Sequence, residues 1–208
     1  MSRSLLVLAP PAAIAGLVLA ATLVVPVSTS AAADPGADRS APGRTVIGTP
    51  RSDILRGTAR DDVLKGLGGD DTAYSFKGED VLALGGGNDF AEAGAGNDHL
   101  DGGSGADFLN GGSDHDRIAG GSSRDEIYDL GGRDRVDAGP GDDSVNAGGG
   151  ADSFLLGDGN DTIFLAVDGA RDTINCGPGQ DRVAWRGRRD PADVIGSCEE
   201  TFIHPRRS

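Results

Sequence analysis

Large apolar residues recur along most of this chain at intervals of nine residues. Around each of them apolar and polar positions alternate over only four or five residues. Alternation this short predicts a brief β-strand with one buried face, and nine residues leave no room for a helix with its loop. The apolar column has fifteen members, of which only Ala73 and Ala91 are small: Leu55, Leu64, Ala73, Leu82, Ala91, Leu100, Leu109, Ile118, Ile127, Val136, Val145, Phe154, Ile163, Ile174 and Val183.

An aspartate stands two residues before each member of the apolar column. Thirteen follow one another at a spacing of nine; a two-residue insertion within 167–170 then shifts the phase, and the series resumes at Asp172 and Asp181. Glycine is frequent two and four residues before the aspartates, as a tight turn with positive φ requires. The thirteen are Asp53, Asp62, Asp71, Asp80, Asp89, Asp98, Asp107, Asp116, Asp125, Asp134, Asp143, Asp152 and Asp161.

Two such units make one coil, in the order turn, strand, turn, strand. Residues eighteen apart then stack on the same side of the molecule, at about 4.8 Å per coil. One edge of the stack carries the column that begins with Asp53, Asp71 and Asp89, and the opposite edge carries the column that begins with Asp62 and Asp80. The apolar residues of both strands face inward and form a thin core.

The combined pattern is G-G-x-G-x-D-x-U-x, where U is a large aliphatic residue. Clear examples are Gly85-Gly86-Gly87-Asn88-Asp89 and Gly102-Gly103-Ser104-Gly105-Ala106-Asp107-Phe108-Leu109. The chain resembles the hemolysin-type (RTX) calcium-binding nonapeptide repeats over residues 45–185. This resemblance implies an all-β fold, a parallel β-roll or β-helix solenoid of stacked nonapeptide repeats. It also implies Ca²⁺ ions between adjacent turns, held by Asp carboxylates and turn carbonyls.

The chemistry of the aspartate columns also favours calcium. Carboxylates stacked one coil apart repel one another, and a divalent cation between the turns reverses the sign of that interaction. Ligands that are all oxygen favour Ca²⁺ over transition metals, and Mg²⁺ demands a smaller octahedral shell. A metal-free glycine-rich solenoid is the alternative, but it leaves the columns unexplained. The predicted metal ligands are Asp71, Asp80, Asp89, Asp98, Asp107, Asp116, Asp125, Asp134, Asp143, Asp152 and Asp161.

Some turns depart from the pattern. Arg51 and Arg60 replace the glycine before Asp53 and Asp62, so the first coil is not expected to bind calcium. Other departures are Ser75-Phe76-Lys77, Asp114, Ser123 and Ala170, before Asp80, Asp116, Asp125 and Asp172. The best-matched sites are Asp89, Asp98, Asp107, Asp143, Asp152 and Asp161.

Composition and charge narrow the function classes. The chain has 35 Gly, 4% aromatic residues and a net charge of −14, and 28 of its 33 acidic residues are Asp. Such an acidic surface argues against a nucleic-acid partner, whose phosphates it would repel. An unpatterned acidic chain would be disordered, but the regular spacing argues against that alternative here.

The N-terminus has the features of a secretion signal. A short basic start at Arg3 precedes a mostly apolar run over 5–27, and the small residues of 30–33 offer a cleavage site before Asp34. Residues 1–33 are therefore predicted to be a signal peptide, residues 34–44 a linker, and the protein secreted without a membrane association after cleavage. An uncleaved membrane anchor is the alternative, because the apolar run is long.

Residues 186–208 are predicted to form a C-terminal cap and tail. A stack of coils exposes its core at both ends and requires such caps. Cys176 and Cys198 are the only cysteines, and in an exported chain they predict a disulfide; two buried thiols are the alternative. Arg186, Arg188 and Arg189 leave a small basic ligand patch as a further possibility.

The sequence contains no recognisable catalytic constellation. His99, His115 and His204 are the only histidines, and the repeats occupy nearly all of the chain after residue 44. The expected function is that of a secreted, non-enzymatic calcium-binding protein that folds on binding Ca²⁺ after export, for adhesion or a cell-surface matrix with an unknown partner. The alternative is a solenoid enzyme that acts on an extracellular polymer through its outer strand face.

Overall fold

A computed structural model describes residues 43–187, 189–198 and 200–203 of the chain. All regular elements in these ranges are β-strands. No helix among them is long and apolar enough to cross a membrane. The predicted signal peptide, residues 1–33, and most of the predicted linker, residues 34–44, lie outside the described residues.

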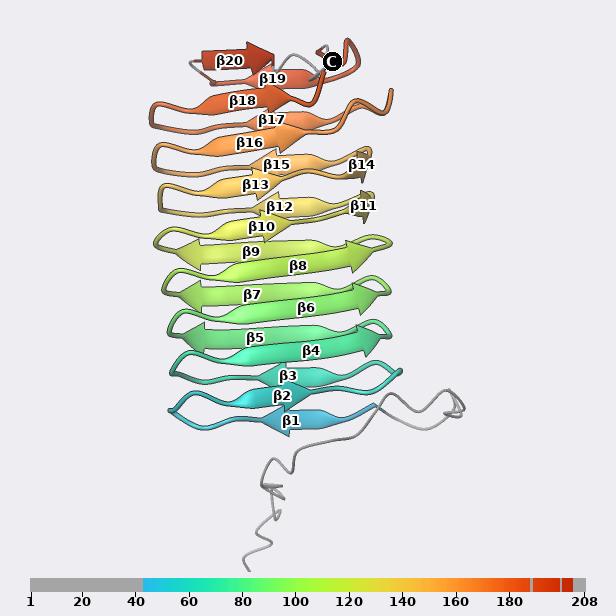
Figure 1. The fold of residues 1–208 in the computed structure, drawn as a ribbon, viewed down its shortest axis with the longest axis vertical. Coiled ribbons are helices and arrows are strands. Elements are labelled where there is room, and N and C mark those ends of the chain that lie inside the picture. The colour runs from blue at the N-terminus through green and yellow to red at the C-terminus, as the bar shows by residue number, and fades with distance from the viewer. Residues whose placement is uncertain (1–42, 188, 199, 204–208) are drawn as a thin grey trace, which may run out of the picture.

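The strands form two parallel sheets that stack along one long axis, and the chain alternates between the sheets (Figure 1). The first sheet contains β1 (Thr45–Ile47), β3 (Val63–Lys65), β5 (Val81–Gly86), β7 (His99–Ser104), β9 (Arg117–Ser122), β12 (Arg135–Asp137), β15 (Ser153–Leu155), β17 (Thr173–Asn175) and β19 (Val194–Gly196). The second contains β2 (Ile54–Arg56), β4 (Thr72–Lys77), β6 (Phe90–Ala95), β8 (Phe108–Ser113), β10 (Glu126–Tyr128), β13 (Ser144–Asn146), β16 (Thr162–Leu165), β18 (Arg182–Trp185) and β20 (Glu200–Ile203). The short strands β11 (Gly131–Gly132) and β14 (Gly149–Gly150) pair with each other at one edge.

The register confirms the eighteen-residue coil. Leu82 on β5 pairs with Leu100 on β7, and Ala91 on β6 pairs with Leu109 on β8. After the insertion the spacing becomes twenty, as between Phe154 and its partner on β17. The two extra residues are accommodated in the loop between β16 and β17, so the parallel pairing continues unbroken. The predicted all-β roll is therefore the fold of the described chain.

The strands from β4 to β9 are longer than the sequence pattern predicts. Each has six residues, because the ladder continues through the glycines of the turn, as in the pair Gly85 and Gly103. Later strands are shorter. Pro140 follows β12 and lacks the N–H that such an extension would use, and Asp129 separates β10 from β11.

The core is a thin double row of side chains between the sheets. All fifteen members of the apolar column are buried, none with more than 2% of its surface exposed. A second inward position lies two residues further along each strand and carries, among others, Leu84, Ala93, Ala138 and Leu156. Such a narrow core buries little apolar surface per coil, so the turns must contribute to stability.

A row of aromatic rings follows the outer face of the second sheet and was not predicted. Ring centroids lie 5.8 Å apart for Tyr74 and Phe90, 5.0 Å for Phe90 and Phe108, and 5.1 Å for Phe108 and Tyr128. The Arg56 guanidinium lies 5.0 Å from the centre of the Tyr74 ring. The rings contact one another along the axis, in stacked or tilted pairs, and stabilise the spacing of successive coils.

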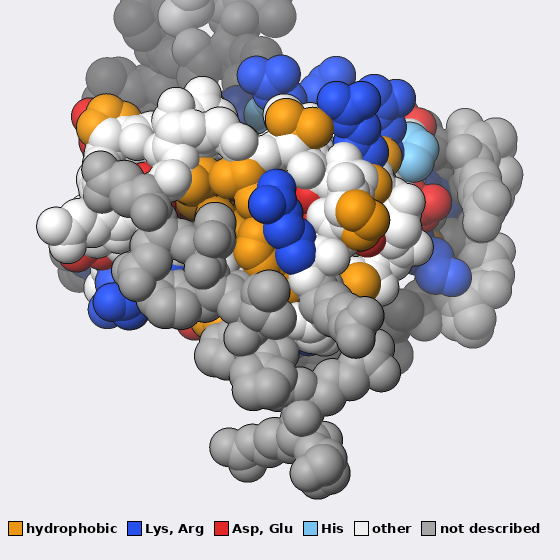
Figure 2. All heavy atoms as spheres, turned by 90° about the horizontal axis from the view of Figure 1, so that it is seen from above, with side chains coloured by type: hydrophobic (Ala, Val, Ile, Leu, Met, Phe, Trp, Pro, Cys, Tyr) orange, Lys and Arg blue, Asp and Glu red, His pale blue; other side chains and the backbone are white. Residues whose placement is uncertain are grey.

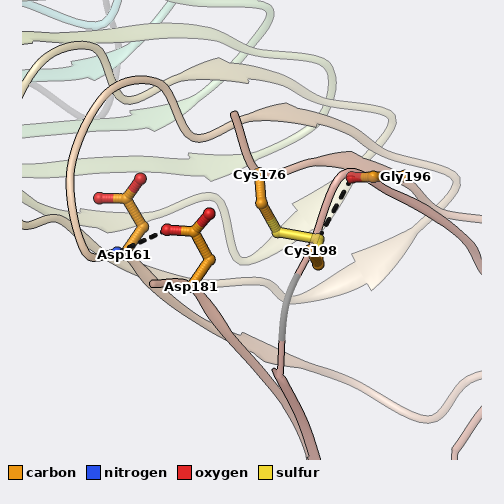
Figure 3. Close-up of a disulfide and its surroundings, with 5 residues drawn as sticks. All are labelled: Asp161, Cys176, Asp181, Gly196 and Cys198. Atoms are coloured by element: carbon orange, nitrogen blue, oxygen red, sulfur yellow. Dashed lines mark hydrogen bonds between the residues drawn. A yellow bond between two sulfur atoms is a disulfide. The ribbon is translucent and has the colours of Figure 1, made fainter. Parts of the chain in front are cut away.

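The C-terminal end carries the predicted disulfide between Cys176 and Cys198, with Cα atoms 5.1 Å apart (Figure 3). It ties the segment after β19 to the end of β17. The Trp185 indole is buried, and its Nε1–H donates to Asp193 Oδ2 at 2.8 Å. Seen from this end, hydrophobic side chains gather in the middle, with Lys and Arg side chains beside them (Figure 2). The disulfide and the indole thus fasten the last coils over the core.

The two described arginines at this end have separate partners. The Arg189 guanidinium lies over the Trp185 ring at 5.6 Å, while Arg186 Nη2 reaches Asn146 Oδ1 at 3.5 Å. Arg188 lies outside the described residues. The basic ligand patch remains an untested alternative.

Candidate metal centre

In most turns from Asp71 onward the backbone passes twice through the left-handed region, at the fourth and second residues before the aspartate. In the turn before Asp107 these are Gly103, with φ of 99°, and Gly105, with φ of 120°. A Cβ on Gly105 would lie 1.8 Å from the carbonyl oxygen of Gly87, one coil earlier. Carbonyl oxygens of each turn therefore point at the glycines of the next turn, where no side chain fits.

Some residues other than glycine adopt the same conformation at these positions. Leu67, Phe76 and Leu130 occupy the first bend, and Asp114 and Ser123 the second, with φ between 61° and 84°. An L-residue in this region is strained by about 1–2 kcal/mol. The departures noted before Asp80, Asp116 and Asp125 thus do not change the course of the backbone.

The aspartates form a ladder of hydrogen bonds between coils. The backbone N–H of Asp89 donates to Asp107 Oδ1 at 2.8 Å, and the same bond recurs in both columns. It extends from Asp53, which donates to Asp71, to Asp172, which donates to Asp193 at 3.3 Å. Each carboxylate is thereby fixed by one oxygen, and the other oxygen is held in a constant position.

The second oxygen, Oδ2, is buried and has no hydrogen-bond partner in any of the eleven predicted ligands. At Gly102 a Cβ would lie 2.4 Å from Asp107 Oδ2 and also 2.4 Å from the carbonyl oxygen of Gly120 in the next coil. Gly66 shows the same arrangement with Asp71 Oδ2 and the Leu84 carbonyl oxygen. These oxygens lie close enough together to bind one cation. The eleven predicted ligands with an unpartnered Oδ2 are Asp71, Asp80, Asp89, Asp98, Asp107, Asp116, Asp125, Asp134, Asp143, Asp152 and Asp161.

The eleven carboxylates divide between the two edges as predicted, because the ladder joins residues eighteen apart. Each of the eleven is no more than 3% exposed. A buried carboxylate oxygen with no donor is costly, and a hard cation is the partner that satisfies it. The arrangement of oxygens therefore fits calcium.

Burial disfavours the charged form of these groups. Burial first, and then the neighbouring carboxylates Asp98 and Asp134, raise the pKa of Asp116 to about 8 against the lowering effect of the backbone N–H of Asp98. Burial likewise raises the pKa of Asp80, Asp125 and Asp143 to about 7. In each case the N–H donated from the previous coil offsets only part of the effect. Burial also raises the pKa of Asp98, Asp107, Asp134 and Asp161 to about 6.

The first coil is different. Thr49 donates both its N–H, at 2.6 Å, and its hydroxyl, at 2.8 Å, to Asp53 Oδ2. Thr58 does the same for Asp62 Oδ2, at 2.5 and 3.0 Å. In these two turns the chain itself satisfies the carboxylate oxygen that is unpartnered elsewhere. A threonine four residues before the aspartate was the sequence signal for this, and it was not recognised.

Two further aspartates belong to the geometry but not to the predicted set. Asp181 continues the ladder after the insertion: it accepts from the Asp161 N–H at 3.0 Å, and its Oδ2 has no partner (Figure 3). Asp129 stands outside the period of nine, at an inward-facing core position, and is fully buried. In the sequence, Asp129 could have been found as an acidic residue at a position where the alternation requires a small or apolar one.

Asp129 extends the carboxylate cluster at one turn. One carboxylate oxygen from each of Asp129, Asp134 and Asp152 lies within 4.8 Å of the others. Asp129 Oδ1 accepts from the Gly148 N–H at 2.6 Å, and Oδ2 has no partner. Burial first, and then the carboxylates of Asp152 and Asp134, raise the pKa of Asp129 to about 8 against the lowering effect of the Gly148 N–H.

The fold and these turns define a class of protein, a parallel β-roll with oxygen-lined gaps between its coils. The family described as RTX calcium-binding nonapeptide repeat (four copies) matches six overlapping stretches of the chain: 47–82, 56–91, 74–109, 84–118, 110–145 and 128–163. The chain belongs to this family and is a calcium-binding repeat protein. No curated protein matches it.

Proposed function

We propose that this chain is a secreted calcium-binding protein that folds when Ca²⁺ binds between its turns after export. In this proposal residues 1–33 are removed as a signal peptide, 34–44 form a linker, 45–185 form the calcium-binding roll and 186–208 the cap and tail. The eleven aspartates from Asp71 to Asp161 are the metal ligands, together with turn carbonyls. The folded roll serves adhesion or a cell-surface matrix.

The observation that carries this proposal is the row of unpartnered Oδ2 atoms. Each is buried, and each is held by the ladder through the other oxygen of its carboxylate; those of Asp71, Asp107 and Asp125 also lie beside a carbonyl oxygen of the neighbouring coil. Calcium binds six to eight oxygens at about 2.3–2.6 Å, so ligands of one ion lie up to about 5 Å apart. Mixed carboxylate and carbonyl ligands at such separations suit calcium better than magnesium or a transition metal.

Folding is coupled to binding by electrostatics. Stacked carboxylates repel one another when no cation is present, and the thin core offers little to offset this. Calcium binds only the folded turns, so its binding free energy becomes folding free energy. At millimolar extracellular calcium, sites with Kd of about 10⁻⁴–10⁻³ M are sufficient.

The disulfide supports export. Such bonds persist in oxidising compartments and are rare in the cytosol. Cys176 and Cys198 are joined in the described chain, which fits the N-terminal secretion signal. The acidic surface, at −14 overall, leaves calcium as the favoured partner and disfavours nucleic acid.

The enzymatic alternative would use the outer strand face. That face carries the aromatic row from Tyr74 to Tyr128, but its rings pack against one another, with Phe90 and Phe108 stacked and the other two pairs tilted. The Tyr128 hydroxyl donates to Glu126 at 2.6 Å. No observation on this face favours catalysis over packing, so we propose no enzymatic activity.

A calcium titration followed by far-UV circular dichroism tests the proposal. Starting from a chelated sample, we expect a cooperative gain of β signal with Ca²⁺ and little gain with Mg²⁺ at the same ionic strength. If neither ion changes the spectrum, calcium-driven folding is wrong. If both ions act alike, the assignment of calcium-specific sites is wrong.

A further inference from the structure

We propose that Asp129 turns the gap between Asp134 and Asp152 into a three-carboxylate site that binds its ion more tightly than the other gaps and fills first. This inference rests on the proposed function, since it assumes that the turns bind calcium. It concerns a residue outside the repeat pattern, which the nonapeptide pattern does not assign as a ligand.

Geometry places Asp129 in the gap. One oxygen from each of the three carboxylates lies within 4.8 Å of the others, which is the separation expected for ligands of one calcium ion. Asp134 and Asp152 are successive members of one column, joined by the Asp134 N–H that donates to Asp152 Oδ1 at 2.8 Å. Among the described residues no other three His, Cys, Asp or Glu side chains are grouped this closely.

The burial of Asp129 and its unpartnered carboxylate oxygen are independent evidence that this side chain binds a cation. Asp129 is fully buried, 0% exposed, and the strands on either side place it between the two sheets. Its Oδ1 is held by the Gly148 N–H, while Oδ2 is buried and has no partner. A buried charge without a partner is among the most costly arrangements in a protein interior.

The positions above and below show that the fold does not require an aspartate here. Eighteen residues before and after Asp129 stand Gly111 and Ala147, and Ala93 occupies the same place one coil further. A small apolar side chain therefore fits this column. A cation bound there would offset the cost of the buried carboxylate, which the fold does not require at this position.

The extra carboxylate determines how tightly this gap is expected to bind an ion and which ions it prefers. An ion in an ordinary gap meets two aspartates of one column, whereas this gap supplies a third full negative charge. One more unit charge about 4 Å or less from a divalent ion increases affinity by at least about tenfold, even with strong solvent screening. A trivalent lanthanide gains more than Ca²⁺, because the attraction scales with the charge of the ion.

The experiment is a calcium-binding titration of the full chain, wild type against Asp129→Asn and Asp129→Ala, by isothermal calorimetry and by competition with a calcium indicator. Asn keeps the oxygen that accepts from Gly148, and Ala matches the neighbouring coils. Asp137→Asn is the control, because it removes the same charge from an exposed position on β12.

We expect one ion to bind wild type and Asp137→Asn at least about tenfold more tightly than the rest, and both Asp129 variants to lose this step. Eu³⁺ excitation spectra report the carboxylates around the first ion bound, and the Asp129 variants should shift that line. Calcium binding that is identical in wild type and Asp129→Asn overturns this inference and leaves the proposed function standing. A wild-type chain that binds no calcium overturns both.

Discussion

The first coil and the central coils carry aspartates of the same two columns, but the carboxylate oxygens Oδ2 have hydrogen-bond donors only in the first coil. In the first coil Thr49 and Thr58 donate N–H and hydroxyl groups to Oδ2 of Asp53 and Asp62. In the central coils the residue at that position is most often a glycine with positive φ, and the corresponding Oδ2 has no donor. The aspartate alone therefore does not define a calcium site in this roll.

The difference shows where the specificity lies. A threonine four residues before the aspartate turns its amide and hydroxyl toward the carboxylate, as in other side-chain-capped turns. In most open turns a residue in the left-handed region turns the backbone so that no donor reaches Oδ2; before Asp152, the N–H of Gly148 donates to Asp129 instead. The fourth residue before each aspartate thus separates turns closed by the chain from turns left open to a cation.

The largest expected effect comes from protonation of the buried aspartates in the central turns when no metal is bound. Burial raises the pKa of Asp80, Asp125 and Asp143 to about 7 and that of Asp116 to about 8. The folded, calcium-free chain therefore binds these protons more tightly than the unfolded chain does. The resulting stabilisation is complete below about pH 4 and is lost as the pH rises through about 6 to 8.

In excess chelator we accordingly expect more β signal in far-UV circular dichroism at about pH 5.5 than at about pH 8. With saturating calcium the order reverses, because protons compete with the ion for the same oxygens. A calcium-free sample that loses β signal on acidification would contradict the burial of these carboxylates.

A matched pair of substitutions tests the comparison next. Asp107→Asn removes the charge from an open turn, whereas Asp53→Asn makes the same change in the same column at a turn closed by Thr49. We expect the first to lower the number of calcium ions bound by at least one and the second to leave it unchanged. Equilibrium dialysis against calcium measures both, and equal losses in the two variants would refute the distinction.

Removing the threonine donor has a smaller effect. Thr58→Ala deletes the hydroxyl bonded to Asp62 Oδ2 but keeps the backbone N–H. Asp62 is buried but keeps its other donors, so the loss of this one hydrogen bond costs about 1 kcal/mol in the free energy of unfolding. Urea denaturation in saturating calcium measures this cost, with Thr72→Ala on the outer face of β4 as the control. Equal stability of Thr58→Ala and wild type would show that the hydroxyl contributes nothing.

Relief of backbone strain gives the smallest effect. Ser123 adopts φ of 84° at a position that is usually glycine. Ser123→Gly is expected to stabilise the roll by about 1 kcal/mol, because glycine populates this region freely. The same denaturation measurement checks this prediction. The reverse change, Gly105→Ser, one coil earlier on the same edge, should destabilise the protein.

Much of this fold followed from periodicity. Nine residues between aspartates fixed the coil at eighteen, and alternation around Leu100 or Ile127 placed those side chains inside. Both edges and the eleven candidate ligands followed from the same spacing. Each of these features repeats, so an error at one coil could not alter the conclusion for the others.

The features that the sequence did not predict are all local. The bonds from Thr49 depend on the φ and ψ angles of one turn, and periodicity carries no information about them. Phe76 and Ser123 show that glycine was not a necessary signal for the left-handed bend, and Gly141 and Gly148 show that it was not a sufficient one. Asp129 departs from the repeat once, and only the packed structure shows that its carboxylate reaches Asp134 and Asp152.

The two-residue insertion has a consequence for how such a chain can lengthen. Its extra residues enter a loop, and the strands on both sides keep their partners at a spacing of twenty. Duplication of eighteen residues would add one complete coil and preserve the orientation of everything that follows. Duplication of nine would rotate the C-terminal part by half a revolution about the long axis and exchange the sheets to which β17 and β18 belong. Tandem duplication in this gene is therefore constrained to whole coils wherever the two edges have different roles.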